Sequence, residues 1–323
     1  MALRAFIAAS LLVVAGLCRA QGVAYTAGGQ SAIDNSQMIY KVTLATGAIA
    51  PVGSAGLYNA DSTNPFLLIS GLTFGTDQKL YAIGLPLKAS QPLLVTLNPA
   101  SGAASVVSTI SGLAGTPAAA SLSLSFSCDG RLWMASSENN NFWQVTPASG
   151  QANLVGSLGV KLTSLAAKGS ALYGFGGSGN ANLYSIDVNT ATASPIGPYG
   201  IAVPNPVDGA FDTSGTMWSL LRNYNDLNNS PLPTQLNTVA QIDPAKGAMT
   251  PLGTIAEPKT NPLYKTTLRG LAIAAPVCVN DPPPSASTSG APMLLPIGLG
   301  AFIASMFATG LFALRRPRRN QFP

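Results

Sequence analysis

Short stretches in which apolar and polar residues alternate recur through the middle of the chain, and each is followed by a turn. Alternation with a period of two predicts a strand with one buried face. The stretch then continues through Asp, Asn or Thr and a small residue or Pro to Gly, which suits a tight turn because Gly adopts positive φ without strain. The five copies of this first motif are residues 39–47, 94–102, 142–150, 183–191 and 239–247.

A second motif alternates with the first, and it predicts another hairpin. Each copy is a strand, a turn rich in Gly, Asp or Ser, and a strand that ends on an aromatic residue. Together the two motifs predict four antiparallel strands per unit, and the turns of the first motif are about 50 residues apart. Four strands per 40 to 50 residues is typical of a β-propeller blade. The copies of the second motif are residues 72–81, 124–133, 165–173 and 209–218.

The fifth copy of the second motif is split between the two ends of the repeat region. Residues 270–273 supply one strand, and the missing partner strand is at residues 23–26. An N-terminal strand that completes the last blade would close the ring and leave no open edge. We therefore predict an all-β fold, a five-bladed propeller over residues 22–276, with a six-bladed ring as the alternative. Ala191 stands where the other copies have Gly, so its turn should be slightly strained.

The repeat resembles that of bacterial secreted propellers with Leu-Tyr-x-Ile-Asp-Pro-x-Thr-Gly units. Residues 183–188 and 239–247 carry this pattern most clearly, and the Gly-His and Trp-Asp pairs of WD40 repeats are absent. The resemblance covers about 255 residues. It implies the fold and leaves the activity open, because propellers host many chemistries.

The N-terminus has the pattern of a signal peptide. Residues 1–20 contain Arg4, a short apolar run and a small residue at Ala20, where we expect signal peptidase to cleave before Gln21. The apolar run is too short for a permanent membrane span. The predicted propeller domain is then residues 21–279.

The C-terminus predicts an anchor. Residues 280–292 are rich in Pro and Ser and form a predicted stalk. Residues 293–314 contain no charge, which is enough for a transmembrane helix. Residues 315–323 follow as an Arg-rich tail that stays in the cytoplasm by the positive-inside rule.

An apolar helix followed by an Arg cluster resembles the C-terminal sorting signals of bacterial surface proteins, of the PEP-CTERM, GlyGly-CTERM and IPTL-CTERM types. The cluster comprises Arg315, Arg316, Arg318 and Arg319, but no Pro-Glu-Pro precedes the helix. The resemblance implies a membrane-embedded sorting protease as a partner. The alternative is an ordinary single-pass anchor.

Composition and charge exclude several classes of protein. The 323 residues are 47% hydrophobic and only 9% charged, which excludes a charged disordered chain. There is no His, which removes Ser-His-Asp catalysis and the commonest metal ligand. The net charge of +5 comes from the ends: residues 21–290 hold eleven basic and all twelve acidic residues, a net charge of −1. We expect no nucleic-acid partner, metal or cofactor.

Candidate site residues are few. Aligning the repeats places Asp208 and Arg269 near the mouth of the central channel on neighbouring blades, where they would bind a small polar ligand or form a structural ion pair. The long segment after residue 221 contains Asn223, Tyr224 and Asp226, residue types suited to sugars or protein partners. No catalytic residue is assigned.

Two cysteines remain after removal of the signal peptide. Cys128 and Cys278 would meet an oxidising environment in an exported protein. A disulfide between them would tie the segment after the propeller to the third blade. Two buried free thiols are the alternative.

These observations predict an exported propeller, held on the envelope or cell surface or released after C-terminal processing. Its expected role is binding or scaffolding, without catalysis, toward an unidentified protein or glycan. A propeller hydrolase or lactonase acting at the channel is the alternative.

Overall fold

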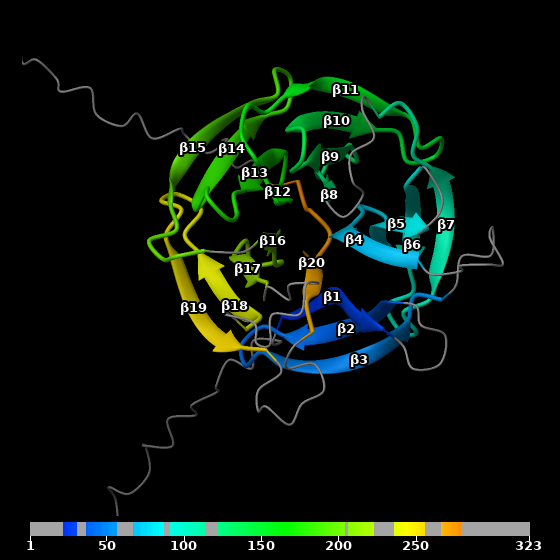
Figure 1. Ribbon diagram of the computed structural model, residues 1–323, viewed down its shortest axis with the longest axis horizontal. Helices are drawn as coiled ribbons and strands as arrows, with labels where there is room; N and C mark the ends of the chain where they lie inside the picture. The colour runs from blue at the N-terminus through cyan, green and yellow to red at the C-terminus, as the bar shows by residue number, and fades with distance from the viewer. Residues whose placement is uncertain are drawn as a thin grey trace, which may run out of the picture. The chain divides into compact units, whose positions relative to one another are not determined.

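The fold is an all-β propeller of five four-stranded antiparallel sheets arranged in a ring (Figure 1). The computed structural model describes residues 22–30, 37–56, 67–86, 91–113, 122–203, 206–222, 236–255 and 266–278. The chain divides into two units, residues 1–286 and 287–323, and all described residues belong to the first. The five blades confirm the prediction from the repeat and exclude the six-bladed alternative.

Each blade is named here by its place in the ring, with its innermost strand first. Blade 1 is β20 (Leu268–Ala272), β1 (Val23–Gln30), β2 (Gln37–Thr43) and β3 (Ala48–Ser54). Blade 2 is β4 (Leu67–Phe74), β5 (Leu80–Pro86), β6 (Leu93–Leu97) and β7 (Ala104–Thr109). Blade 3 is β8 (Leu122–Phe126), β9 (Leu132–Ser136), β10 (Asn141–Val145) and β11 (Ala152–Ser157). Blade 4 is β12 (Ser164–Lys168), β13 (Ala171–Phe175), β14 (Asn182–Asp187) and β15 (Thr192–Pro198), and blade 5 is β16 (Val207–Phe211), β17 (Met217–Leu221), β18 (Thr238–Ile242) and β19 (Met249–Thr254).

The ring closes as the split repeat predicts. Strand β1 pairs on one side with β2 and on the other with β20, the last strand of the chain to be described. Tyr25 lies opposite Ala272, and Ala27 lies opposite Arg269. The first blade is therefore built from both ends of the propeller.

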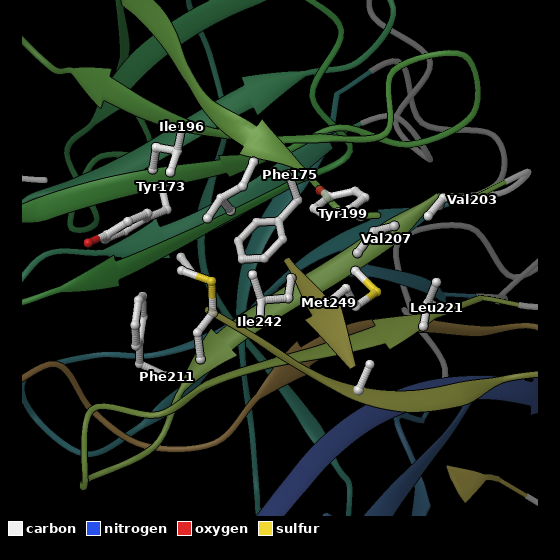
Figure 2. Close-up of a cluster of buried hydrophobic side chains, with 14 residues drawn as sticks. Tyr173, Phe175, Ile196, Tyr199, Val203, Val207, Phe211, Leu221, Ile242 and Met249 are labelled. Carbon is white, nitrogen blue, oxygen red and sulfur yellow. The ribbon is translucent and has the colours of Figure 1, made fainter. Parts of the chain in front are cut away.

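Burial falls from the inside of the ring to the outside. Every residue of β8, β9 and β17 is buried, whereas the outermost strands β3 and β7 are mostly exposed or half-buried. The apolar core consists of five clusters, and each lies between two neighbouring blades. Figure 2 shows the cluster between blades 4 and 5, where Phe175 packs close to the backbone of Gly209. A Cβ atom at Gly209 would lie 2.0 Å from Cζ of that ring, so the position requires glycine.

Pairs of side chains of complementary size link the blades near the ends of the inner strands. The second strand of each blade carries a Tyr or Trp that lies in the cluster shared with the next blade. Three Tyr residues each meet a Phe, with ring centroids 4.9 to 5.8 Å apart. Two Trp residues instead pack in the same clusters as smaller residues, Ala167 and Ile273. The ring pairs are Tyr25–Phe74, Tyr81–Phe126 and Tyr173–Phe211.

The turns follow the sequence motif, including its exception. Ala191 has φ of 54°, the left-handed conformation that Gly47, Gly102, Gly150 and Gly247 adopt at the equivalent turns. The predicted strain at this turn is therefore present, because a Cβ atom disfavours positive φ.

The predicted signal peptide, stalk and C-terminal helix, residues 293–314, lie outside the described residues. Within the described ranges, no helix is long and apolar enough to cross a membrane.

The complementary sizes of side chains that meet between blades predict how the interface of Tyr81 and Phe126 responds to substitution. Phe126→Ala should lower the free energy of unfolding by about 3–5 kcal/mol, because it leaves a cavity against Tyr81. Tyr81→Trp alone should overpack the interface and cost about 1–3 kcal/mol. The double variant should be more stable than Phe126→Ala, since the larger ring fills space that the smaller residue leaves, as in the cluster that combines Trp133 with Ala167. Denaturant unfolding of the four proteins measures this coupling, and purely additive losses would contradict the pairing.

Candidate functional site

A ring of polar residues lines one level of the five inner strands. In each inner strand, one residue is paired with the Tyr or Trp of the second strand. The polar residue precedes that paired residue by two positions, or by three positions in the two strands that contain a bulge. The bulges are at Gly71 and Gly270, which have φ of 53° and 70°. We call this set the polar ring; it consists of Ser70, Ser123, Ser164, Asp208 and Arg269.

The three serines of the polar ring are hydrogen-bonded to backbone groups of neighbouring strands. The Ser70 hydroxyl donates to the carbonyl of Leu122 in the next blade at 3.0 Å. The Ser123 hydroxyl donates to the Ala135 carbonyl at 3.4 Å, and Ser164 Oγ accepts the backbone N–H of Gly209 at 3.3 Å. Their hydroxyls thus satisfy buried backbone groups.

Asp208 forms an ion pair with Arg222. Asp208 is the second residue of β16, and Arg222 follows the end of β17, whose Leu221 lies opposite Val207. The guanidinium donates to both carboxylate oxygens through Nε and Nη2. The side chains are only 3% and 10% exposed. Sequence reasoning placed Asp208 at the channel but missed Arg222, because only the pairing of β16 with β17 brings the two together.

Arg269 lies on β20, beside β16 in the ring. Its backbone carbonyl accepts the Thr26 hydroxyl at 3.1 Å. Within the described part of the chain, its guanidinium has no ion pair, and Asp208 and Arg222 are the charged groups that influence it. Burial and the positive charge of Arg222 lower the pKa of Arg269, and the carboxylate of Asp208 partly opposes them. The structure thus brings the two predicted channel residues to one end of the channel, where Asp208 pairs with Arg222.

The remaining predicted site residues lie outside the described residues. These are Asn223, Tyr224 and Asp226 of the long segment, Ala20 and Gln21 at the predicted cleavage point, and the cluster Arg315, Arg316, Arg318 and Arg319.

A cavity of about 220 Å³ lies at the other end of the inner strands. The second halves of all five inner strands line it, with the turn after β16 and the segment that follows β20. Phe74, Phe126 and Phe211 contribute apolar surface, and Thr73 and Ser125 contribute hydroxyls. Sequence reasoning did not find this cavity, because its wall includes a segment without repeat pattern, residues 274–277.

Cys128 and Cys278 form a disulfide. Their Cα atoms are 5.0 Å apart, and the bond joins residues separated by 150 positions. Cys128 lies in the turn between β8 and β9, and Cys278 ends the described segment after β20. Figure 1 shows this segment running from β20 toward β8 and β12. The disulfide thus fastens the segment that borders the cavity to blade 3.

The acidic residues of the turns have structural partners. Asp212 accepts hydrogen bonds from the Ser214 backbone N–H and hydroxyl, the Thr216 backbone N–H and Trp218 Nε1, at 2.6 to 3.0 Å. Burial alone would raise the pKa of Asp212, but these hydrogen bonds outweigh it and lower the pKa. Asp77 accepts the Tyr81 hydroxyl at 3.0 Å, and burial together with this bond raises the pKa of Tyr81 to about 12.

Metal ligands are not gathered in the described ranges. No group of three or more His, Cys, Asp or Glu side chains lies together there.

Comparison with known proteins shows likeness in fold only. No protein-family model matches the chain, and no curated protein matches it in sequence. Among solved structures, it is similar to one chain of the nidogen–laminin complex, with 13% identity over 80% of this chain and 100% of that one, at a TM-score of 0.48. It is also similar to a Bacteroides caccae protein of unknown function, with 9% identity, 78% and 98% coverage and a TM-score of 0.45.

A third similar structure is virginiamycin B lyase from Staphylococcus aureus. The identity is 12%, the coverage is 75% of this chain and 72% of that one, and the TM-score is 0.39. At these identities and TM-scores, no activity carries over from any of the three proteins to this chain.

The buried ion pair predicts a non-additive pattern of stability. Asp208→Asn should lower the free energy of unfolding by about 3–5 kcal/mol, because it leaves Arg222 buried without its counter-charge. Adding Arg222→Met should recover part of that loss, since both buried charges are then gone. Lys246→Gln is the control: its exposed pair with Asp243 spans 3.9 Å, and its loss should cost less than about 1 kcal/mol. Equal effects of Asp208→Asn and Lys246→Gln in denaturant unfolding would refute a structural role for the buried pair.

The lowered pKa of Asp212 predicts a pH-dependent stability. The ionised carboxylate stabilises the fold at pH values above about 4, and this stabilisation is lost as the pH falls through the folded pKa, below that value. Asp212→Asn should therefore be less stable than the unchanged protein at pH 7, and the difference should narrow as the pH falls below about 4. Thermal unfolding of both proteins between pH 3 and pH 7 measures this difference in stability. A difference that stays constant over this range would contradict the assignment.

Proposed function

We propose that the chain is exported, is held at the cell envelope by its C-terminal segment, and presents its propeller as a rigid binding module. The observation that carries this proposal is the disulfide between Cys128 and Cys278. Disulfides persist in oxidising compartments and are rare in a reducing cytosol. The signal-peptide pattern of residues 1–20 agrees with that compartment.

The position of the disulfide also supports the proposed attachment. It fastens the last described residues of the propeller, directly before the Pro-rich segment that leads to the apolar residues 293–314. The disulfide joins this end of the propeller to blade 3 by a second covalent link, in addition to the chain itself.

Binding is favoured over hydrolysis by the bonding of the channel carboxylate. A hydrolase or lactonase would need Asp208 to act as a base or to hold a metal, but both of its oxygens accept hydrogen bonds from Arg222. The serines of the polar ring are likewise bonded to the backbone. A ring whose side chains are bonded in this way is suited to presenting fixed surfaces, and loops on a rigid scaffold commonly carry recognition.

Export and anchoring are tested by the intact mass and thiol state of the native protein. We expect a chain that begins at Gln21 and whose cysteines resist alkylation until a reductant is added. A Cys278→Ser variant should leave Cys128 open to alkylation without reduction. A native chain that retains residues 1–20 and carries its three cysteines, Cys18 included, as free thiols would refute export.

The same measurement of intact mass distinguishes a processed C-terminal sorting signal from a permanent membrane anchor. Loss of the segment from about Met293 onward in protein from the surface or medium would support a processed sorting signal. A chain that continues to Pro323 in the membrane fraction would support a permanent anchor.

A further inference from the structure

The cavity at the disulfide end of the channel lies where the inner strands carry small residues. In each inner strand, the residue paired with the Tyr or Trp of the second strand lines this cavity, and none of these side chains extends beyond the γ position. Small side chains at one level of all five strands leave space that a close-packed core would fill. The space measures about 220 Å³. The five residues are Thr73, Ser125, Ala166, Ala210 and Ala272.

The five blades contribute different chemistry to this wall. Blades 1, 4 and 5 supply Ala at this level, whereas blades 2 and 3, which are in contact through β4 and β8, supply the hydroxyls of Thr73 and Ser125. Three phenyl rings border the same space. The cavity therefore offers hydroxyls on one side and apolar contacts from several others. The rings are those of Phe74, Phe126 and Phe211.

The two hydroxyls differ in their bonding. The Thr73 hydroxyl donates to the Phe74 carbonyl at 3.4 Å and accepts the Phe126 backbone N–H at 3.3 Å. Ser125 is only 3% exposed, and within the described part of the chain its hydroxyl has no hydrogen-bond partner. Buried hydroxyls normally have one. Because Ser125 lines the cavity, its partner has to come from what occupies the cavity.

Charge favours a neutral occupant. Among the described residues that line the cavity, only Lys168 and Asp212 are charged, and their charges cancel. The Asp212 carboxylate already accepts hydrogen bonds from Ser214, Thr216 and Trp218. The wall thus has neither a net charge that would attract an ion nor a free carboxylate for a cation.

The volume of the cavity limits the size of the occupant. An apolar cavity of about 150 Å³ holds benzene, whereas sites for drug-sized ligands measure about 300–1,000 Å³. A cavity of about 220 Å³ therefore suits one ring with a short substituent. Neighbouring phenyl rings favour an aromatic ring in particular.

The cavity is also accessible and firmly built. Val277 lines it and is exposed, which gives a ligand a route from solvent. The disulfide of Cys278 fastens residues 274–277, so this part of the wall is already in place before a ligand arrives. Binding to such a preformed site costs little ordering of the protein.

We propose that this cavity binds a small neutral aromatic molecule that carries one hydroxyl group. The aromatic ring packs among the phenyl rings and alanines, and the hydroxyl bonds to Ser125. The proposal rests on the proposed binding role and names the chemical class of a ligand.

The test is titration of the native full-length protein with benzyl alcohol, toluene, benzoate or glucose, in one detergent at a fixed concentration. The methyl NMR signals of Leu72, Leu165 and Ile273, which line the cavity, report binding there. Benzyl alcohol should shift these signals saturably, because a bound aromatic ring alters the resonances of nearby methyl groups. At equal free concentration, toluene should bind roughly 3- to 10-fold more weakly, since it lacks the hydroxyl. Benzoate and glucose should leave the signals unchanged.

Ser125→Ala tests the hydrogen bond. It should weaken the binding of benzyl alcohol roughly 3- to 10-fold and leave that of toluene unchanged, because only the alcohol can bond to Ser125. Ser219→Ala is the matched control: it removes a buried hydroxyl of β17 that is not among those lining the cavity, and it should change neither affinity. All variants are titrated in the same detergent, so their comparison does not depend on how much probe enters the micelles.

Ala210→Leu tests the cavity itself. Ala210 is half-buried and lines the cavity, so a longer side chain should occupy the space that the ligand needs. Both aromatic probes should bind about 10-fold more weakly or not at all. The variant should melt at or above the temperature of the unchanged protein, because it fills a cavity. If it fails to fold, the comparison of Ser125→Ala with Ser219→Ala still decides.

Several outcomes would overturn the proposal. Methyl signals that stay unshifted at the highest soluble concentration of benzyl alcohol would show that the cavity takes no such ligand. Benzoate or glucose binding as tightly as benzyl alcohol would assign another chemical class. Equal losses of both aromatic probes in Ser125→Ala would contradict the hydrogen bond, and shifts that survive Ala210→Leu would place the probe elsewhere. None of these outcomes depends on the mass and thiol experiments, so the export proposal stands or fails separately.

Discussion

The pairing of β1 with β20 is the interaction on which the rest of the structure depends. Each blade buries its faces only against its two neighbours, so the core exists as five interfaces in a closed circle. Blade 1 takes part in two of them and exists only when the two ends of the propeller come together. This closure has a high entropic cost because it joins residues nearly 250 positions apart, and it is offset by the apolar surface that both interfaces bury. The disulfide acts on the same end of the chain and holds it after closure.

Much of this architecture could be predicted from the sequence because it depends on local pattern. Period-two alternation and turn chemistry locate the strands, and the repeat gives the number of blades. The Ala191 turn was predictable because the other four copies have Gly at that position. The split repeat located the closure of the ring, because the incomplete unit at residues 270–273 lacks a strand that residues 23–26 can supply.

The site was less predictable because it depends on contacts that the repeat does not encode. Bulges at Gly71 and Gly270 shift the inner strands of two blades by one residue, so the repeat alone does not show which inner-strand residues share the level of the polar ring. Arg222 belongs to no motif, and only strand pairing places it beside Asp208. The matching of Trp with a small residue and Tyr with Phe between blades involves residues that lie far apart in the sequence. Neither residue, taken by itself, carries a sequence signal that identifies the other.

The disulfide also determines how a pulling force would pass through the molecule. Tension on the chain beyond Cys278, directed along β20, would otherwise load the hydrogen bonds between that strand and β1 in shear. Because Cys278 is joined to Cys128, the load enters the turn between β8 and β9 instead, and the Cys128 backbone N–H is bonded to the Gly169 carbonyl of blade 4 at 2.9 Å. Force is thus divided between two complete blades on a different side of the ring, and the closing strand is shielded from shear. The pairing of β20 with β1 would therefore carry little of such a load while this covalent bond remains intact.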